Sequence, residues 1–164
     1  PAVFSTTGNS YPHIVLRGGK RPNYDAESIA FCETALRAAH LPVQIIVDCS
    51  HGNSGKHPER QGIVMKDLLS QIEKGNRSIR GFMLESHLEG GCQPMPKDPA
   101  LLRPGQSVTD ACIDWDTTET LLREARDRYK TVLEERYTSC DGHPRKTNTS
   151  PHMANGPSAP QQTL

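Results

Sequence analysis

The sequence predicts an α/β fold that forms part of a (β/α)8 (TIM) barrel, and three observations support this prediction. Three short apolar runs are typical of buried strands, helical patterns lie between them, and a polar residue recurs at the carboxyl end of each strand. Strands that alternate with helices imply right-handed crossovers and a parallel sheet. Along the 164 residues the predicted order is strand, helix, strand, helix, strand, long loop and helix, with a tail after them.

The three apolar runs are short and contain almost no polar residue before their ends. They are HIVL at 13–16, VQIIVD at 43–48 and IRGFMLE at 79–85. They are bounded upstream by Pro or by a Gly-Asn pair. Runs of this length and composition are typical of strands that are buried on both faces, as in a parallel sheet.

Helical patterns fill the two gaps between these strands. Asp25 is a suitable N-cap for a first helix. Pro58 suits the first turn of a second helix, and Gly75 ends it. The apolar positions recur at helical spacing: Ile29, Cys32, Leu36 and Ala39 in the first helix, and Ile63, Leu68, Leu69 and Ile72 in the second.

A third helix follows a long loop after the last strand. Asp116 and Glu119 have the spacing of a capping box. Leu122, Ala125, Tyr129, Val132 and Arg136 follow at helical intervals. The last stretch is rich in Pro, Ser, Thr, Asn and Gly and cannot bury enough apolar surface to offset its ordering entropy. We therefore expect a folded portion over 1–138 and a disordered tail over 139–164.

Polar residues lie at the ends of the three strands at equal spacing. Arg17 ends the first strand, His51 follows the second and Glu85 ends the third, and successive members are 34 positions apart. One βα unit of an eight-unit barrel takes about 31 residues. The three side chains should therefore lie on adjacent strands at the carboxyl rim, where barrel enzymes place their chemistry.

His51 and Glu85 are candidate metal ligands, and Asp110, on the loop after the last strand, is a third. Imidazole nitrogen and carboxylate oxygen together suit Mn, Fe, Zn or Co rather than Ca. Each residue also has a purely structural interpretation, because a histidine at a strand end often only makes hydrogen bonds and Asp110 suits a turn or a cap.

Arg17 lies in LRGGK, and glycines beside an arginine let the backbone approach an anion that the guanidinium binds. An ion pair with an acid on a neighbouring strand explains Arg17 equally well. Lys20 and Lys56 on the rim loops could help to hold a phosphate, and His87 could reach the same rim. Cys49 is better explained as a small core residue than as a nucleophile.

Composition excludes several classes of protein. Lys plus Arg and Asp plus Glu both number 19, so the chain has no net charge and no basic excess for binding nucleic acid. No apolar stretch approaches the ~20 residues that span a bilayer, and no signal segment opens the chain. The five cysteines are scattered, which suits the reducing cytoplasm.

Four motifs, in order, resemble the C-terminal portion of class I 3-deoxy-D-arabino-heptulosonate 7-phosphate (DAHP) synthases. They are HIVLRGGKRPNY, VDCSHGNSGK, MLESHLEGG and SVTDACIDW, within residues 1–125. The resemblance implies the last three βα units of a (β/α)8 barrel, an interpretation that also fits a chain that begins at Pro1 without Met. Members of the family usually form dimers or tetramers.

The resemblance also implies an activity and a set of site residues. The family condenses phosphoenolpyruvate with erythrose 4-phosphate and water, releasing phosphate, as the first step of the shikimate pathway to aromatic amino acids. By motif, Arg17 becomes a phosphoenolpyruvate ligand, and His51, Glu85 and Asp110 become three of four ligands of a divalent metal ion. The fourth ligand of the family is a cysteine on an early strand, and nothing in this sequence matches it.

Two other functions remain open at this stage. The chain could be a non-catalytic remnant or a module that only binds anions, and it would then keep the arginine site without the reaction. A barrel aldolase that uses a Schiff-base lysine is less well supported, because no lysine lies at a strand tip. Three βα units cannot close a barrel, so we expect the isolated chain to lack synthase activity.

Overall fold

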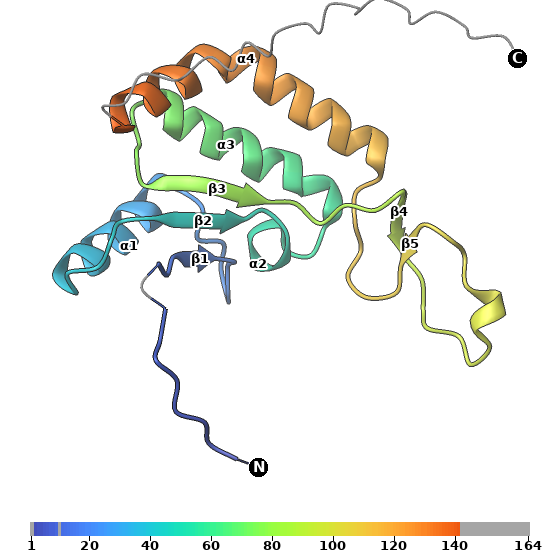
Figure 1. Ribbon diagram of the computed structural model, residues 1–164. Coiled ribbons are helices and arrows are strands. Elements are labelled where there is room, and N and C mark those ends of the chain that lie inside the picture. Colours follow the sequence, from blue (N-terminus) through green and yellow to red (C-terminus); the bar gives the residue numbers. More distant parts are fainter. Residues whose placement is uncertain (1, 10, 142–164) are drawn as a thin grey trace, which may run out of the picture.

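The computed structural model describes residues 2–9 and 11–141, and its centre is a parallel sheet of three strands (Figure 1). The strands are β1 (Ile14–Leu16), β2 (Ile45–Asp48) and β3 (Ile79–Met83), in the order β1-β2-β3. Their register pairs Val15 with Ile46 and Ile46 with Gly81. The predicted α/β class and all three strands are therefore confirmed.

Helices cover one face of this sheet. They are α1 (Ala26–Ala38), α3 (Gln61–Glu73) and α4 (Trp115–Asp141), and α4 lies alongside α3 (Figure 1). The core between sheet and helices contains Ile29, Ile45, Val47, Leu68, Ile79 and Tyr129. Asp25 caps α1 as predicted, because its carboxylate accepts hydrogen bonds from the amide and the hydroxyl of Ser28.

The opposite face of the sheet is not covered by any described element. Alternate residues of a strand point to opposite faces, and Val47 is fully buried whereas Val15, on the other face, is 49% exposed. The prediction that the strands are buried on both faces therefore holds for one face only, because the described residues contribute no second layer. On this uncovered face, called the bare face below, Arg17 lies two positions after Val15, and Asp48 lies two positions after Ile46.

The predicted start of α4 is wrong by two residues. Asp114, and not Asp116, accepts the hydrogen bond from the amide of Thr117, at 2.7 Å. Glu119 pairs with Arg123 instead of closing a capping box. At its other end α4 continues to Asp141, so residues 139–141 of the predicted tail are helical, and 142–164 lie outside the described residues.

One predicted apolar position in each of two helices is wrong, although Leu68, Leu69, Ile72, Ala125 and Tyr129 are buried as the helical spacing predicts. Ile63 and Leu122 are 62% and 44% exposed, whereas their neighbours Val64 and Leu121 are buried. In both pairs the two residues are apolar, so the sequence pattern alone does not distinguish which one enters the core.

Short elements lie between the main strands and helices. A four-residue helix, α2 (His51–Ser54), follows β2, and a 3-10 turn, η1 (Pro58–Arg60), begins at Pro58, where the sequence predicted the first turn of the second helix, and leads into α3. Beyond β3, a small parallel pair of β4 (Glu89–Cys92) and β5 (Gln106–Ser107), with a 3-10 turn η2 (Pro99–Leu101) between them, forms an arm beside the main sheet (Figure 1). This arm carries the chain to Asp110.

Candidate metal and anion site

Three of the predicted site residues meet at the carboxyl end of the sheet. The ligand atoms of His51, Glu85 and Asp110 all lie within 4.8 Å of one another. Nε2 of His51 is 3.4 Å from Oε1 of Glu85 and 3.5 Å from Oδ2 of Asp110. One imidazole nitrogen and two carboxylate oxygens form a donor set that fits a transition-metal dication. The arrangement can therefore hold a metal ion.

His51 is held in one orientation by a buried carboxylate. Its Nδ1 lies 2.6 Å from Oδ2 of Asp48, and Oδ1 of Asp48 accepts the amide hydrogen of Ser50 at 2.8 Å. A carboxylate that bonds Nδ1 fixes the orientation of the ring and leaves Nε2 available to coordinate a metal ion. Metal-binding histidines are usually supported in this way. The backbone of His51 adopts φ 40°, a conformation that is uncommon outside glycine.

Glu85 is held from two directions. The hydroxyl of Ser50 donates to Oε2 of Glu85 at 2.7 Å. The fully buried Gln61, the first residue of α3, exchanges two hydrogen bonds with the backbone of Glu85, at 2.7 and 3.0 Å. Sequence reasoning missed the roles of Asp48, Ser50 and Gln61, although Asp48 and Ser50 lie within the VDCSHGNSGK motif.

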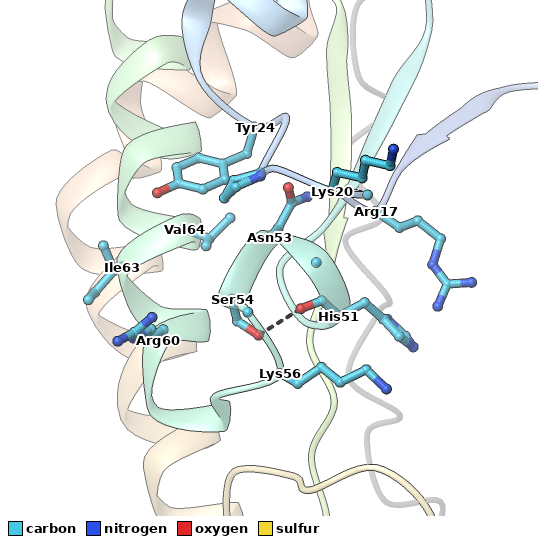
Figure 2. Close-up of a pocket in the computed structure, with 15 residues that line it drawn as sticks. Arg17, Lys20, Tyr24, His51, Asn53, Ser54, Lys56, Arg60, Ile63 and Val64 are labelled. Carbon is cyan, nitrogen blue, oxygen red and sulfur yellow. Dashed lines mark hydrogen bonds between the residues drawn. The ribbon is translucent and has the colours of Figure 1, made fainter.

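Arg17 lines a cavity of about 780 Å³ that also reaches His51. In Figure 2, Arg17 and His51 extend to the same side of the short helix α2, and Tyr24 and Val64 lie on its other side. The cavity is also lined by Lys20, Lys56 and Arg60, and none of its lining residues is acidic. Such a surface favours an anionic ligand.

Two of the weaker predictions can be compared with the structure. Lys56 Nζ lies 3.8 Å from Oδ1 of Asp110, so this lysine connects the cationic cavity with the acidic group. His87 is not part of the metal-ligand group found among the described residues. It is exposed, and its Nδ1 accepts the amide hydrogen of Leu88 at 2.8 Å.

The thiols of the two cysteines beside the site both have a pKa above the ordinary cysteine value. Burial raises the pKa of Cys49 to about 12, and the charge of Asp48 adds to this effect. Burial also raises the pKa of Cys112, and the nearby Glu85 and Asp110 carboxylates add to it. The prediction that Cys49 is a core residue is confirmed, because its side chain is fully buried.

The chain is similar to known proteins in both sequence and structure. The family model described as the DAHP synthetase I family matches residues 2–123. A Tyr-sensitive phospho-2-dehydro-3-deoxyheptonate aldolase of Enterobacter agglomerans is 47% identical over 82% of this chain. The Tyr-sensitive enzyme of Escherichia coli K12 is 46% identical over 75% of it. The solved structure of the aldolase from Francisella tularensis SCHU S4 superimposes with a TM-score of 0.71, at 38% identity over 82% of this chain.

These relatives are longer than the segment that matches. The match spans 63% of the Enterobacter agglomerans protein, 35% of the Escherichia coli protein and 38% of the Francisella tularensis chain. Among the residues that the structure describes, no helix is both long and apolar enough to cross a membrane.

Proposed function

This chain belongs to the DAHP synthetase I family, and on that premise we propose that it carries the metal-binding and anion-binding residues of a 3-deoxy-7-phosphoheptulonate synthase. The proposed reaction condenses phosphoenolpyruvate with erythrose 4-phosphate and water, and it releases DAHP and phosphate as the first step toward aromatic amino acids. The observation that carries the proposal is the convergence of His51, Glu85 and Asp110 beside a cationic cavity.

We assign His51, Glu85 and Asp110 as ligands of a divalent ion, with Mn, Fe, Zn or Co as the candidates. When bound, such an ion would polarise the aldehyde of erythrose 4-phosphate and stabilise the charge that develops on its oxygen. The chain's own contribution is to hold three donors together. Asp48 keeps Nε2 of His51 directed toward the other two ligands, and Ser50 restrains the Glu85 carboxylate.

We assign Arg17 to phosphoenolpyruvate. A guanidinium binds phosphate or carboxylate oxygens through two parallel hydrogen bonds. Lys20 and Lys56 line the same cavity and add positive charge for a substrate that carries several negative charges. The shared cavity of Arg17 and His51 supports a role in which the anion is held next to the ion that acts on its reaction partner.

We further propose that the chain forms the C-terminal part of a (β/α)8 barrel, which acts in the cytoplasm as a homo-oligomer. The bare face of the sheet supports this proposal, because it carries the site residues at its rim and lacks a covering layer among the described residues. Three strands leave two open edges, β1 and β3, so the isolated segment should not assemble a working site. The four described cysteines form no disulfide, which supports a reducing compartment.

The test compares the full-length protein with the isolated 164-residue chain. Both are assayed with phosphoenolpyruvate, erythrose 4-phosphate and Mn, and phosphate release and DAHP are measured with and without a chelator. We expect chelator-sensitive turnover by the full-length protein and none by the isolated chain. A full-length protein that binds phosphoenolpyruvate without turnover would instead identify an anion-binding module. Turnover by the isolated chain would contradict the partial-barrel proposal.

A further inference from the structure

We propose that Asn53 is a positioning residue that fixes the anion-binding Arg17 relative to the metal-binding His51. The inference rests on the proposed function of those two residues. It concerns a side chain that lines the same cavity and to which no role is assigned above. Asn53 lies in α2, two residues after His51, and its side chain is buried, with 4% of the residue exposed.

The amide group of Asn53 joins the ends of two strands. Its Nδ2 donates to the carbonyl of Leu16, the last residue of β1, at 3.1 Å, and to the carbonyl of Asp48, the last residue of β2, at 2.8 Å. Arg17 directly follows the first of these carbonyls. Asp48 orients His51. Both donors of the amide are therefore used to hold together the two strand tips from which the site is built.

The acceptor of Asn53 fixes the loop that follows Arg17. Its Oδ1 accepts the amide hydrogen of Asn23 at 2.8 Å. The side chain of Asn23 in turn accepts the amide hydrogen of Gly18 at 2.8 Å. This pair of asparagines closes the segment after Arg17 back onto α2, so the backbone on both sides of Arg17 is restrained.

The two segments also touch directly through their backbones. The amide of Gly52 donates to the carbonyl of Arg17 at 3.0 Å. A Cβ atom on Gly18 would lie only 2.5 Å from the carbonyl carbon of Gly52, closer than real contacts allow. The side-chain amide of Asn53 thus stabilises the close contact between Gly18, which follows Arg17, and Gly52, which follows His51.

The chain offers a matched control at the other end of the same sheet. Asn76 also makes a side-chain bridge: its Nδ2 donates to Glu33 at 3.0 Å, and its Oδ1 accepts the amides of Ser78 and Ile79 at 2.9 and 3.0 Å. Asn76 precedes β3 and so lies at the amino end of the sheet, away from the site. Its loss should reduce stability without moving Arg17 or His51.

The experiment uses the full-length protein and three variants, Asn53→Ala, Asn23→Ala and Asn76→Ala. Mn binding is measured by titration calorimetry, phosphoenolpyruvate binding is measured without erythrose 4-phosphate, and the thermal midpoint is recorded for each variant. For Asn53→Ala we expect both affinities to fall about tenfold, the lower end of the losses seen when support of a metal ligand is removed. Asn23→Ala should weaken phosphoenolpyruvate binding alone, because it releases Gly18 but leaves Asp48 and His51 in place.

Asn76→Ala should lower the thermal midpoint and leave both affinities unchanged. Equal losses of affinity in Asn76→Ala and Asn53→Ala would show that only general stability is involved, and wild-type affinities in Asn53→Ala would also overturn the inference. If Asn53→Ala does not fold, the Asn23→Ala result decides, because loss of both affinities or of neither contradicts the proposed restraint. A wild-type protein that binds neither Mn nor phosphoenolpyruvate would refute the proposed function itself and remove this premise.

Discussion

Nδ1 of His51 lies 2.6 Å from Oδ2 of Asp48, whose side chain is 4% exposed. The other carboxylate oxygen of Asp48 accepts the amide of Ser50, so both oxygens are used as acceptors. This arrangement places an N–H on Nδ1 of His51, so Nε2 is the ring nitrogen that faces Glu85 and Asp110 and can coordinate a metal ion. The role of His51 as a ligand therefore depends on Asp48.

Replacing Asp48 with Asn should weaken metal binding in the full-length protein by about 10- to 100-fold, as for other supports of metal ligands. The Ser50 amide and Nδ1–H of His51 bond different oxygens of Asp48, and an asparagine has an acceptor in only one of these two positions. Metal affinity would be measured by competition with a chelating dye. Asp67→Asn, an equal charge change on the exposed face of α3, is the control. Equal affinity in the two variants would contradict the prediction.

Loss of a metal ligand and loss of the anion ligand should have different kinetic signatures. In His51→Ala and Glu85→Ala, metal content and kcat should fall together, with kcat reduced more than about 100-fold because a Lewis acid contributes several kcal/mol. Arg17→Ala should keep its metal and raise KM for phosphoenolpyruvate about 10- to 100-fold, since an anion contact acts mostly as uniform binding. Elemental analysis and steady-state kinetics would be compared. Full metal and full kcat in His51→Ala would contradict the ligand assignment.

Two adjacent glycines should respond very differently to alanine. Gly18 has φ 73° and its Cβ would clash with the backbone of Gly52, whereas a Cβ on Gly19 would meet nothing within 4 Å. We expect Gly18→Ala to lower the free energy of unfolding by more than about 2 kcal/mol, from backbone strain and overpacking together. Gly19→Ala should stay within about 0.5 kcal/mol of the wild type. Urea unfolding measures both values, and similar losses would contradict the backbone contact.

The start of α4 can be tested with two neighbouring aspartates. Asp114→Ala should lower the unfolding midpoint in urea, whereas Asp116→Ala should not, because only Asp114 accepts the Thr117 amide. Hydrogen bonds from Thr117 lower the pKa of Asp114. Its stabilising effect is therefore present above the ordinary aspartate pKa and is lost as the pH falls through the lowered value. A larger effect of Asp116→Ala than of Asp114→Ala would contradict this prediction and support the capping box of Asp116 and Glu119 instead.

Much of the main sheet and of the ligand group follows from the sequence alone. The strands are short continuous apolar runs, and residues such as Arg17 and His51 occur where such runs stop. Because parallel strands end at the same edge of a sheet, the equal spacing was enough to predict that Arg17, His51 and Glu85 lie at one rim. Asp110 could not be placed in this way, since the long segment before it has no periodicity. Asp110 was a candidate from its side-chain chemistry, and the family resemblance then implied its role as a ligand.

The features that the sequence did not predict depend on contacts across the fold. The hydrogen bonds of Asn53 reach residues up to 37 positions away, and no local pattern encodes such a partner. The choice between Leu121 and Leu122 for the core depends on how α4 lies against α3. The strands β4 and β5 are too short to show an alternating pattern, and β4 also contains two glycines. They are stabilised by pairing with each other.

The contact between Gly18 and Gly52 also restricts how this sequence can change over generations. The nearest atoms that a Cβ on either glycine would meet are backbone atoms of the facing segment, and every amino acid has those atoms. Therefore no substitution at one of the two positions can relieve the clash that a side chain at the other position would cause. A screen for second-site suppressors of Gly52→Ala should recover true revertants, or changes that shift β1 against β2, and none at position 18. The two positions are thus fixed independently, although they touch.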